Sequence, residues 1–387
     1  MNSTLVKLGY AALFLIFRMA ATAAAQDSSQ HYLSDSAMLK IAGDKYATGE
    51  LPLGDGKYVL DAPRMGYIYL CRKFGEEGPA GAERNGPWIH GGTWNLHEKI
   101  SVDGQVRWPN AYLSIRRQGD QRIFDGNGLP TEQTTGIFPI QPNDPAYAFD
   151  RNPNSIVAQS IKEALPANPA YSDPPYCMGM EAGYMLNGVP LFNGFDAGMR
   201  DAAAHEIQDS CQGHPQRTGT YHYHSLSSCL QNAAVKNVIG YALDGFPITG
   251  PTVTQGKYLT TANLDECHGI TSEIIEDGHK KISYHYVMTE DFPYSVSCFR
   301  ARPVRIGPLQ RIHGTNNAEA GGELTLPAGP VGNDGPRRPP IEALNACAGK
   351  RDSDACDFVS PRGDSISGTC HAPPHRPLAC MPAHPPE

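Results

Sequence analysis

The chain has 387 residues, of which 32 are basic and 40 acidic, and its formal net charge at pH 7 is −8. This balance excludes the basic footprint of proteins that bind nucleic acid or anionic lipid surfaces. The chain also contains 40 glycines and 33 prolines, and such frequent interruption into short segments is typical of β-rich proteins.

The first 25 residues have the pattern of a cleaved secretory signal. Lys7 precedes an apolar run over residues 8–17, and small residues fill positions 21–25. The run is too short to span a bilayer, although a retained N-terminal anchor is the alternative. Cleavage would remove Lys7 and Arg18 and leave 30 basic against 40 acidic residues. We therefore predict a secreted or periplasmic bacterial protein with no transmembrane segment after cleavage.

The remaining chain is predicted to be mainly β, with one large domain over residues 58–308. Residues 26–57 are polar and weakly patterned, which indicates a loosely attached leader. One helix is expected over residues 196–208, with Asp196 as its N-cap. A β-sandwich or barrel-like domain with few short helices suits this pattern. The expected strands are 66–71, 102–108, 111–115, 122–124, 240–248, 282–288 and 295–300.

Residues 309–340 are rich in Gly, Pro, Asn and Asp without periodicity, which predicts a linker. Residues 341–387 contain four cysteines and too few apolar residues to build a core. We therefore predict a small Cys-rich module that two disulfides hold together.

All ten cysteines lie beyond the signal, and in an exported protein an even number indicates disulfides rather than metal ligands. We predict five bridges, two of them within the C-terminal module. The other three predicted pairs are Cys71 with Cys177, Cys211 with Cys229, and Cys267 with Cys298.

The motif Tyr221-His222-Tyr223-His224 is the most informative stretch of the chain. Successive side chains of a β-strand point to opposite faces, so the two histidines would share one face and the two tyrosines the other. The imidazoles would then lie about 7 Å apart along the strand. That spacing suits one shared metal ion or a proton-relay pair. Residues 284–286 repeat the letters Tyr-His-Tyr.

Several longer motifs follow one another between about residues 60 and 306. They include NGVPLFN at 187–193, HEIQDSC at 205–211, IGYALDGFPI at 239–248 and LDECHG at 264–269, together with the YHYH motif itself. With these motifs the chain resembles the bacterial YHYH protein family. It departs from the family at Thr249, where an aromatic residue is usual, and at Val287, where a second YHYH motif would end. The resemblance implies a shared domain and leaves the reaction open.

The histidines predict a transition-metal site for copper, zinc or iron, because neutral imidazole is a preferred ligand of these ions. His222 and His224 would supply two ligands. We expect His285 as the third, because its Tyr-His-Tyr context suits a neighbouring strand, and His205 and His214 are further candidates. Such a site could belong to a redox or hydrolytic enzyme that acts on a small molecule.

Other functions remain open at this point. In acid–base catalysis without a metal, a neutral histidine removes a proton and a tyrosine donates one, which would suit a lyase or hydrolase on an extracellular polymer. Candidate catalytic residues are Tyr221, Tyr223, Glu206 and Asp244, of which the two carboxylates could instead orient imidazoles around a metal. A non-catalytic cell-surface or structural module is a further alternative. Calcium is another possible ligand, but only as a structural ion, because the sequence contains no calcium-binding loop with regularly spaced carboxylates.

Overall fold

The computed structural model describes residues 32–44, 46, 48–73, 82, 84–306, 343, 346–347, 350–359, 365–371 and 378–382. The chain divides into two units, Met1–His313 and Gly314–Glu387, and each is described by itself. The predicted signal peptide and the predicted linker lie outside the described residues. Among the described helices, none has the length and apolar character needed to cross a membrane.

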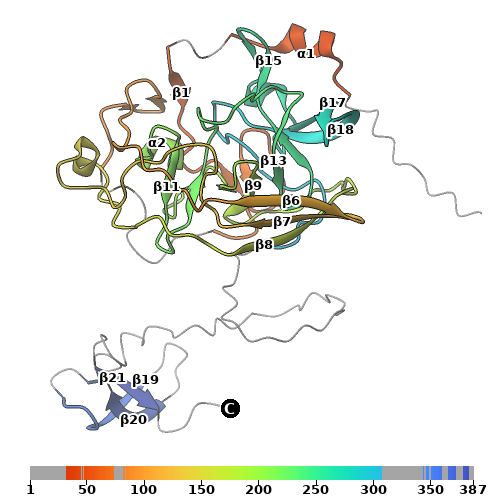
Figure 1. Ribbon diagram of the computed structural model, residues 1–387. Coiled ribbons are helices and arrows are strands. Elements are labelled where there is room, and N and C mark those ends of the chain that lie inside the picture. The colour runs from red at the N-terminus through yellow and green to blue at the C-terminus, as the bar shows by residue number, and fades with distance from the viewer. Residues whose placement is uncertain are drawn as a thin grey trace, which may run out of the picture. The chain divides into compact units, whose positions relative to one another are not determined.

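An eight-stranded sheet forms the centre of the first unit and confirms the mainly β prediction (Figure 1). Its strands in spatial order are β11 (Gly213–Pro215), β12 (Tyr221–Tyr223), β10 (Pro190–Phe192), β9 (Glu181–Met185), β13 (Val238–Ala242), β14 (Pro247–Thr249), β18 (His279–Val287) and β17 (Gly269–Glu276). The strand order is symmetric about the β9–β13 contact. Each half contains two antiparallel strand pairs, and one parallel contact joins the two pairs of a half. This contact is β10 with β12 in the first half and β14 with β18 in the second.

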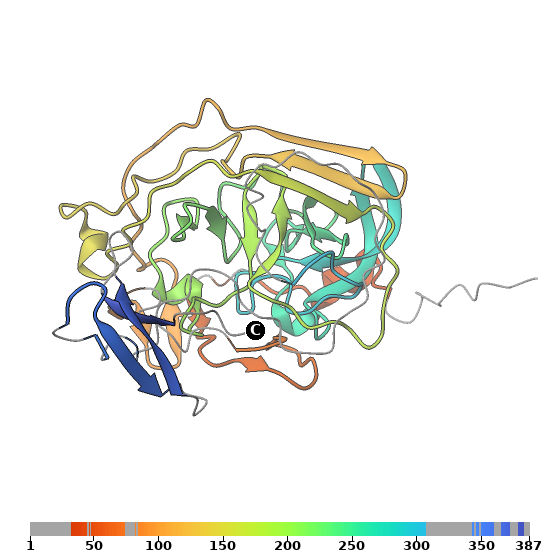
Figure 2. The same cartoon turned by 90° about the horizontal axis from the view of Figure 1, so that it is seen from below.

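A second sheet packs on the central one at the contact between the halves. It consists of β6 (Leu113–Gln118), β7 (Gln121–Gly126) and β8 (Ile161–Pro166). Phe124 of β7 contacts Tyr184 of β9 and Tyr241 of β13, with ring centroids 5.7 and 6.0 Å apart. Buried Arg122 also donates to Glu276 and Asp277 at 3.0 and 2.8 Å, and Figure 2 shows β6 and β7 reaching the β17–β18 hairpin there.

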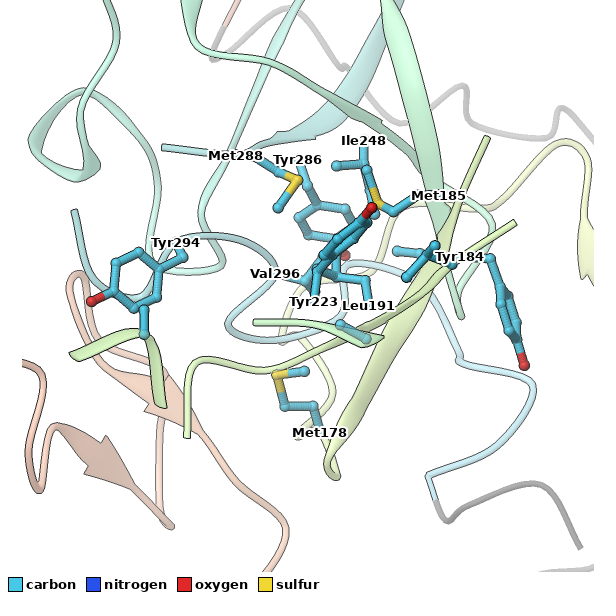
Figure 3. Close-up of a cluster of buried hydrophobic side chains, with 14 of the residues drawn as sticks. Met178, Tyr184, Met185, Leu191, Tyr223, Ile248, Tyr286, Met288, Tyr294 and Val296 are labelled. Atoms are coloured by element: carbon cyan, nitrogen blue, oxygen red, sulfur yellow. The ribbon is translucent and has the colours of Figure 1, made fainter. Parts of the chain in front are cut away.

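Short elements complete the first unit. They are α1 (Asp35–Ile41), β1 (Glu50–Pro52), β2 (Tyr58–Val59), β3 (Ile68–Tyr69), β4 (Ile89–His90), β5 (Thr93–Asn95), the 3-10 helix η2 (Pro145–Ala148), α2 (Ala202–His205), β15 (Thr252–Thr254), β16 (Lys257–Tyr258) and the 3-10 helix η3 (Thr261–Asn263). The main apolar core includes side chains from both halves of the central sheet, and Figure 3 shows Tyr223 and Tyr286 in it together with Leu191 and Ile248.

The segment expected to be a loose leader contributes to the fold from residue 32 onward. Met38 of α1 is fully buried in a second apolar cluster, and β1 pairs with β5, which buries Leu51. The leader prediction is therefore wrong for these residues, because a few apolar side chains spaced among polar ones are enough to attach the segment.

The helix expected over residues 196–208 is also much shorter. The Asp196 carboxylate accepts hydrogen bonds from the backbone N–H groups of Gly198 and Arg200, and Met199 has a φ of 64°. These contacts close a turn instead of starting a helix. The actual N-cap is Asp201, whose side chain accepts from the Ala204 N–H.

All five predicted disulfides are confirmed. The first unit contains Cys71–Cys177, Cys211–Cys229 and Cys267–Cys298. In the second unit, Cys347–Cys370 and Cys356–Cys380 hold the antiparallel sheet of β19 (Ala355–Val359), β20 (Ser365–His371) and β21 (Ala379–Pro382). The bridges substitute for the large core that this short module lacks.

Candidate metal centre

Three histidines come together at the β11–β12 hairpin. His214 of β11 is the direct cross-strand partner of His222 of β12, and His224 follows two residues later. One ring nitrogen from each of the three lies within 4.8 Å of the others. As strand alternation predicts, the tyrosines have separate partners. Tyr221 donates to Asp209 at 2.9 Å, and the Tyr223 hydroxyl bonds Asn187 at 3.0 Å.

The hydrogen bonds of His222 and His224 determine where their protons lie. His222 Nδ1 is 3.1 Å from the Thr220 carbonyl oxygen, and His224 Nδ1 is 2.6 Å from that of Asn193. A carbonyl oxygen can only accept, so each Nδ1 must carry the ring proton. Both Nε2 atoms of the neutral rings then present lone pairs, and these two atoms are only 3.0 Å apart. This contact is repulsive unless a cation lies between or beside the two nitrogens.

His214 and Glu206 complete the cluster without finding hydrogen bonds of their own. Both His214 nitrogens and Glu206 Oε2 are buried and have no hydrogen-bond partner. Glu206 Oε2 lies 3.4 Å from His214 Nε2 and 3.5 Å from His224 Nε2, but not in hydrogen-bond geometry. Buried polar atoms that lack partners are costly, so these three atoms beside the paired Nε2 atoms make the cluster a candidate ligand site.

Burial keeps the histidines neutral. It lowers the pKa of His214 and His222 well below the ordinary value, with an added contribution from the neighbouring rings, and it lowers the pKa of His224 to about 4. Burial also raises the pKa of Glu206 well above its ordinary value, and the nearby carboxylates of Asp196 and Asp150 act in the same direction. Neutral imidazoles are the form that binds metal ions.

The arrangement fits a tetrahedral ion. Nitrogens bonded at about 2.0 to 2.1 Å to such an ion lie about 3.3 Å from one another. The 3.0 Å between His222 and His224 is near this value, and a His214 nitrogen that lies within 4.8 Å of the other two would need to move closer to them. Metal-bound histidines usually donate their second ring N–H to a carbonyl or carboxylate, as His222 and His224 already do.

Two residues that support the cluster were not predicted. Phe192 stacks on His222, with ring centroids 4.1 Å apart and an interplanar angle of 30°. Lys99 donates to the backbone carbonyls of Ala203 and Glu206, the latter at 2.6 Å, and to the side chain of Gln208. Lys99 therefore holds the end of α2, from which Glu206 extends. Phe192 lies within the family motif at 187–193, but no sequence pattern points to Lys99.

The expectation that His285 is the third ligand is wrong. Its ring nitrogens bond the hydroxyls of Thr249 at 2.9 Å and Ser272 at 2.8 Å, in the other half of the sheet. His205 also lies outside the cluster, because its ring bonds Asn85 and Asp55, each at 3.0 Å.

Of the candidate catalytic residues, only Glu206 adjoins the histidines. Asp244 accepts hydrogen bonds from the Tyr286 hydroxyl at 2.6 Å and from the Ala301 N–H at 3.0 Å, so it serves the fold. Tyr221 donates its hydroxyl proton to Asp209, and the Tyr223 hydroxyl accepts from Asn187, so both hydroxyls have partners away from the cluster.

The family described as YHYH protein matches residues 163–257, a segment that includes Glu206 and the three clustered histidines. The predicted resemblance is confirmed over this segment, and the chain carries a YHYH domain there. No curated protein and no solved structure matches the chain.

Proposed function

We propose that the chain, through its YHYH domain, binds one transition-metal ion with His214, His222 and His224. The observation that carries this proposal is the 3.0 Å contact between the two Nε2 atoms, whose rings both hold their protons on Nδ1. A bound cation supplies the positive charge that turns this repulsive contact into a ligand pair. Zinc, copper and iron are the ions whose ligand preference fits three imidazoles.

We further propose that Glu206 is the fourth ligand and that the site is closed. Its carboxylate lies beside two of the histidines, and Lys99 holds the backbone that carries it. Four protein ligands are typical of structural zinc sites, whereas catalytic sites keep one position open. The three imidazoles are at most 3% exposed, so a polymer could not reach them. This burial supports a closed metal centre over polymer hydrolysis or acid–base chemistry.

Export is also part of the proposal. Five disulfides across both units suit a protein that works in an oxidising compartment. In such a compartment free thiols are not available as metal ligands, and histidine with carboxylate is then the natural ligand set.

The test is metal analysis of the purified, disulfide-bonded chain after chelation, dialysis and return of Zn²⁺. The wild type should bind one Zn²⁺ per chain, and His214→Ala should weaken the affinity at least 100-fold. His285→Ala is the matched control, because His285 is equally buried but has partners for both ring nitrogens; it should still bind one ion. Near-zero metal in the wild type and in a His222→Ala, His224→Ala double variant alike would contradict the proposal.

A second measurement tests whether the site is closed. Co²⁺ can replace Zn²⁺ and reports its coordination through its visible spectrum. Azide should leave this spectrum unchanged if Glu206 fills the fourth position, whereas Glu206→Ala should become sensitive to azide. A wild-type spectrum that responds to azide would indicate an open position and favour an enzyme.

A further inference from the structure

The two halves of the central sheet share a sequence pattern as well as a strand order. Residues 184–191 (YMLNGVPL) and 241–248 (YALDGFPI) agree in the pattern Tyr-x-Leu-Asn/Asp-Gly-x-Pro-Leu/Ile. Residues 209–213 and 265–269 both have Asp-x-Cys-x-Gly, and residues 221–223 and 284–286 both have Tyr-His-Tyr. The three matches occur in the same order, which indicates an internal duplication.

The matched segments also occupy equivalent places in the two halves of the sheet. Tyr184 and Tyr241, which are equivalent, pair with each other across the β9–β13 contact, as residues beside a two-fold axis must. Gly188 and Gly245 both lie at turns, with φ of 91° and 90°.

The hydrogen bonds repeat as well. Tyr221 donates to Asp209 and Tyr284 donates to Asp265. At the next tyrosine the partners are equivalent but the direction is reversed, because Tyr286 donates to Asp244 whereas the Tyr223 hydroxyl accepts from Asn187. Cys211 and Cys267, which occupy the same motif position, each form a disulfide with a cysteine that follows the Tyr-His-Tyr strand.

The duplication assigns an equivalent to each of the three clustered histidines and to Phe192. Gly213 pairs with Tyr223 as Gly269 pairs with Tyr286. Hence His285 is equivalent to His222, and its cross-strand partner Ile270 is equivalent to His214. The residue two positions later, Val287, is equivalent to His224. Thr249 occupies the position of Phe192, since Pro247 pairs with Tyr241 as Pro190 pairs with Tyr184.

In the second half, His285 finds hydrogen-bond partners without a metal. The Thr249 hydroxyl bonds His285 Nδ1 at 2.9 Å, and the Ser272 hydroxyl bonds Nε2 at 2.8 Å. Hydroxyls both donate and accept, so they suit either tautomer of the ring. Ile270 and Val287 pack with Met38 of α1 in an apolar cluster. At the position equivalent to the metal centre, the second half therefore has one hydrogen-bonded histidine among apolar side chains, on strands with the same pairing.

We propose that this second half holds a latent transition-metal site centred on His285, which three substitutions make functional. Ile270→His and Val287→His restore the two absent imidazoles at positions that already have the correct register. Ser272→Ala frees Nε2, while Thr249 keeps Nδ1 in place, as the Thr220 carbonyl does for His222. This inference rests on the proposed function of the first half.

The experiment measures Zn²⁺ per chain after equilibrium dialysis of the full, disulfide-bonded protein. The triple variant should bind two ions where the wild type binds one, and it should bind one in a His214→Ala background. A triple variant that is folded by circular dichroism, carries no free thiols and still binds only one ion overturns the inference, while the metal centre of the first half stands. A wild type without Zn²⁺ contradicts the proposed function, and a gain of one ion by the triple variant would still support the latent site.

Folding has its own control. Two imidazoles in the apolar cluster lower the melting temperature in chelator, because buried polar groups without partners are costly, and added Zn²⁺ should recover it. If the triple variant does not fold, Val287→His with Ser272→Ala gives two imidazoles and leaves Ile270 in place. This pair should bind an additional Zn²⁺ at least tenfold more weakly than the first. A folded pair without additional Zn²⁺, or a pair that also does not fold, overturns the inference.

Discussion

Replacing His214 by leucine should change stability in opposite directions with and without metal. In the metal-free protein both His214 nitrogens are buried without partners, and each such group costs about 1 to 3 kcal/mol. Leucine removes both groups and brings a packing mismatch of about 1 kcal/mol. At the lower end of that cost, two groups less the mismatch leave a stabilisation of about 1 kcal/mol for His214→Leu in the metal-free protein. With free Zn²⁺ at about 1,000 times its dissociation constant, the wild type gains about 4 kcal/mol that the variant largely loses.

Urea unfolding of both proteins, in excess chelator and in excess Zn²⁺, measures the two differences. The disulfides stay intact, and the change in midpoint is evaluated at a common slope. His214→Leu should unfold at the higher urea concentration in chelator, and the wild type at the higher urea concentration in Zn²⁺. If His214→Leu destabilises the chelated protein by the 2 to 5 kcal/mol of an ordinary core truncation, His214 has partners that our account of the site does not include.

Three further predictions concern residues around the centre and in the fold. A Cβ at Gly213 would lie 2.2 Å from the Tyr221 ring, so Gly213→Ala should cost about 1 to 3 kcal/mol in urea unfolding; no loss would contradict this packing. Lys99→Met should weaken Zn²⁺ binding about tenfold, because Glu206 loses its backbone support; unchanged affinity in a dialysis assay would refute that role. Burial raises the pKa of Asp244 to about 6 despite its hydrogen bond from Tyr286. Because this folded-state pKa lies above the unfolded value, stability should fall by at most about 3 kcal/mol between pH 4 and 6; Asp244→Asn should reduce that fall, and an unchanged pH dependence would argue against the raised pKa.

Alternation along the strand was enough to place His222 and His224 together, because the side-chain period of a strand is two wherever pairing is regular. The third histidine was harder to predict. The repeated Tyr-His-Tyr suggested a neighbouring strand, whereas it marks the equivalent strand of the other half, with β10, β9, β13 and β14 in between. A hairpin partner for the motif lay closer in sequence, at His214, and the repeat itself was visible at residues 184–191 and 241–248.

Local side-chain hydrogen bonds and contacts distant in sequence together explain the parts that the sequence did not predict. Propensity favoured a helix over residues 196–208, but Asp196 closes a turn and α2 has only four residues. Lys99 approaches Glu206 from more than 100 residues away, and local pattern carries no information about such a contact. The three pairs predicted for the first unit are correct, and so is the number of bridges in the C-terminal module, whose pairing was left open; an oxidising compartment leaves few thiols unpaired.

The Cys211–Cys229 bridge encloses all three histidines within a sequence separation of 18 residues. Closing so short a loop costs little chain entropy, and contacts that are local in sequence form early. The three imidazoles can therefore come together as soon as the first half of the sheet folds, before the second half has formed. An ion that the proposed centre takes up at that stage would be enclosed as the rest of the core forms, so chelation and reloading of the folded protein should require long equilibration.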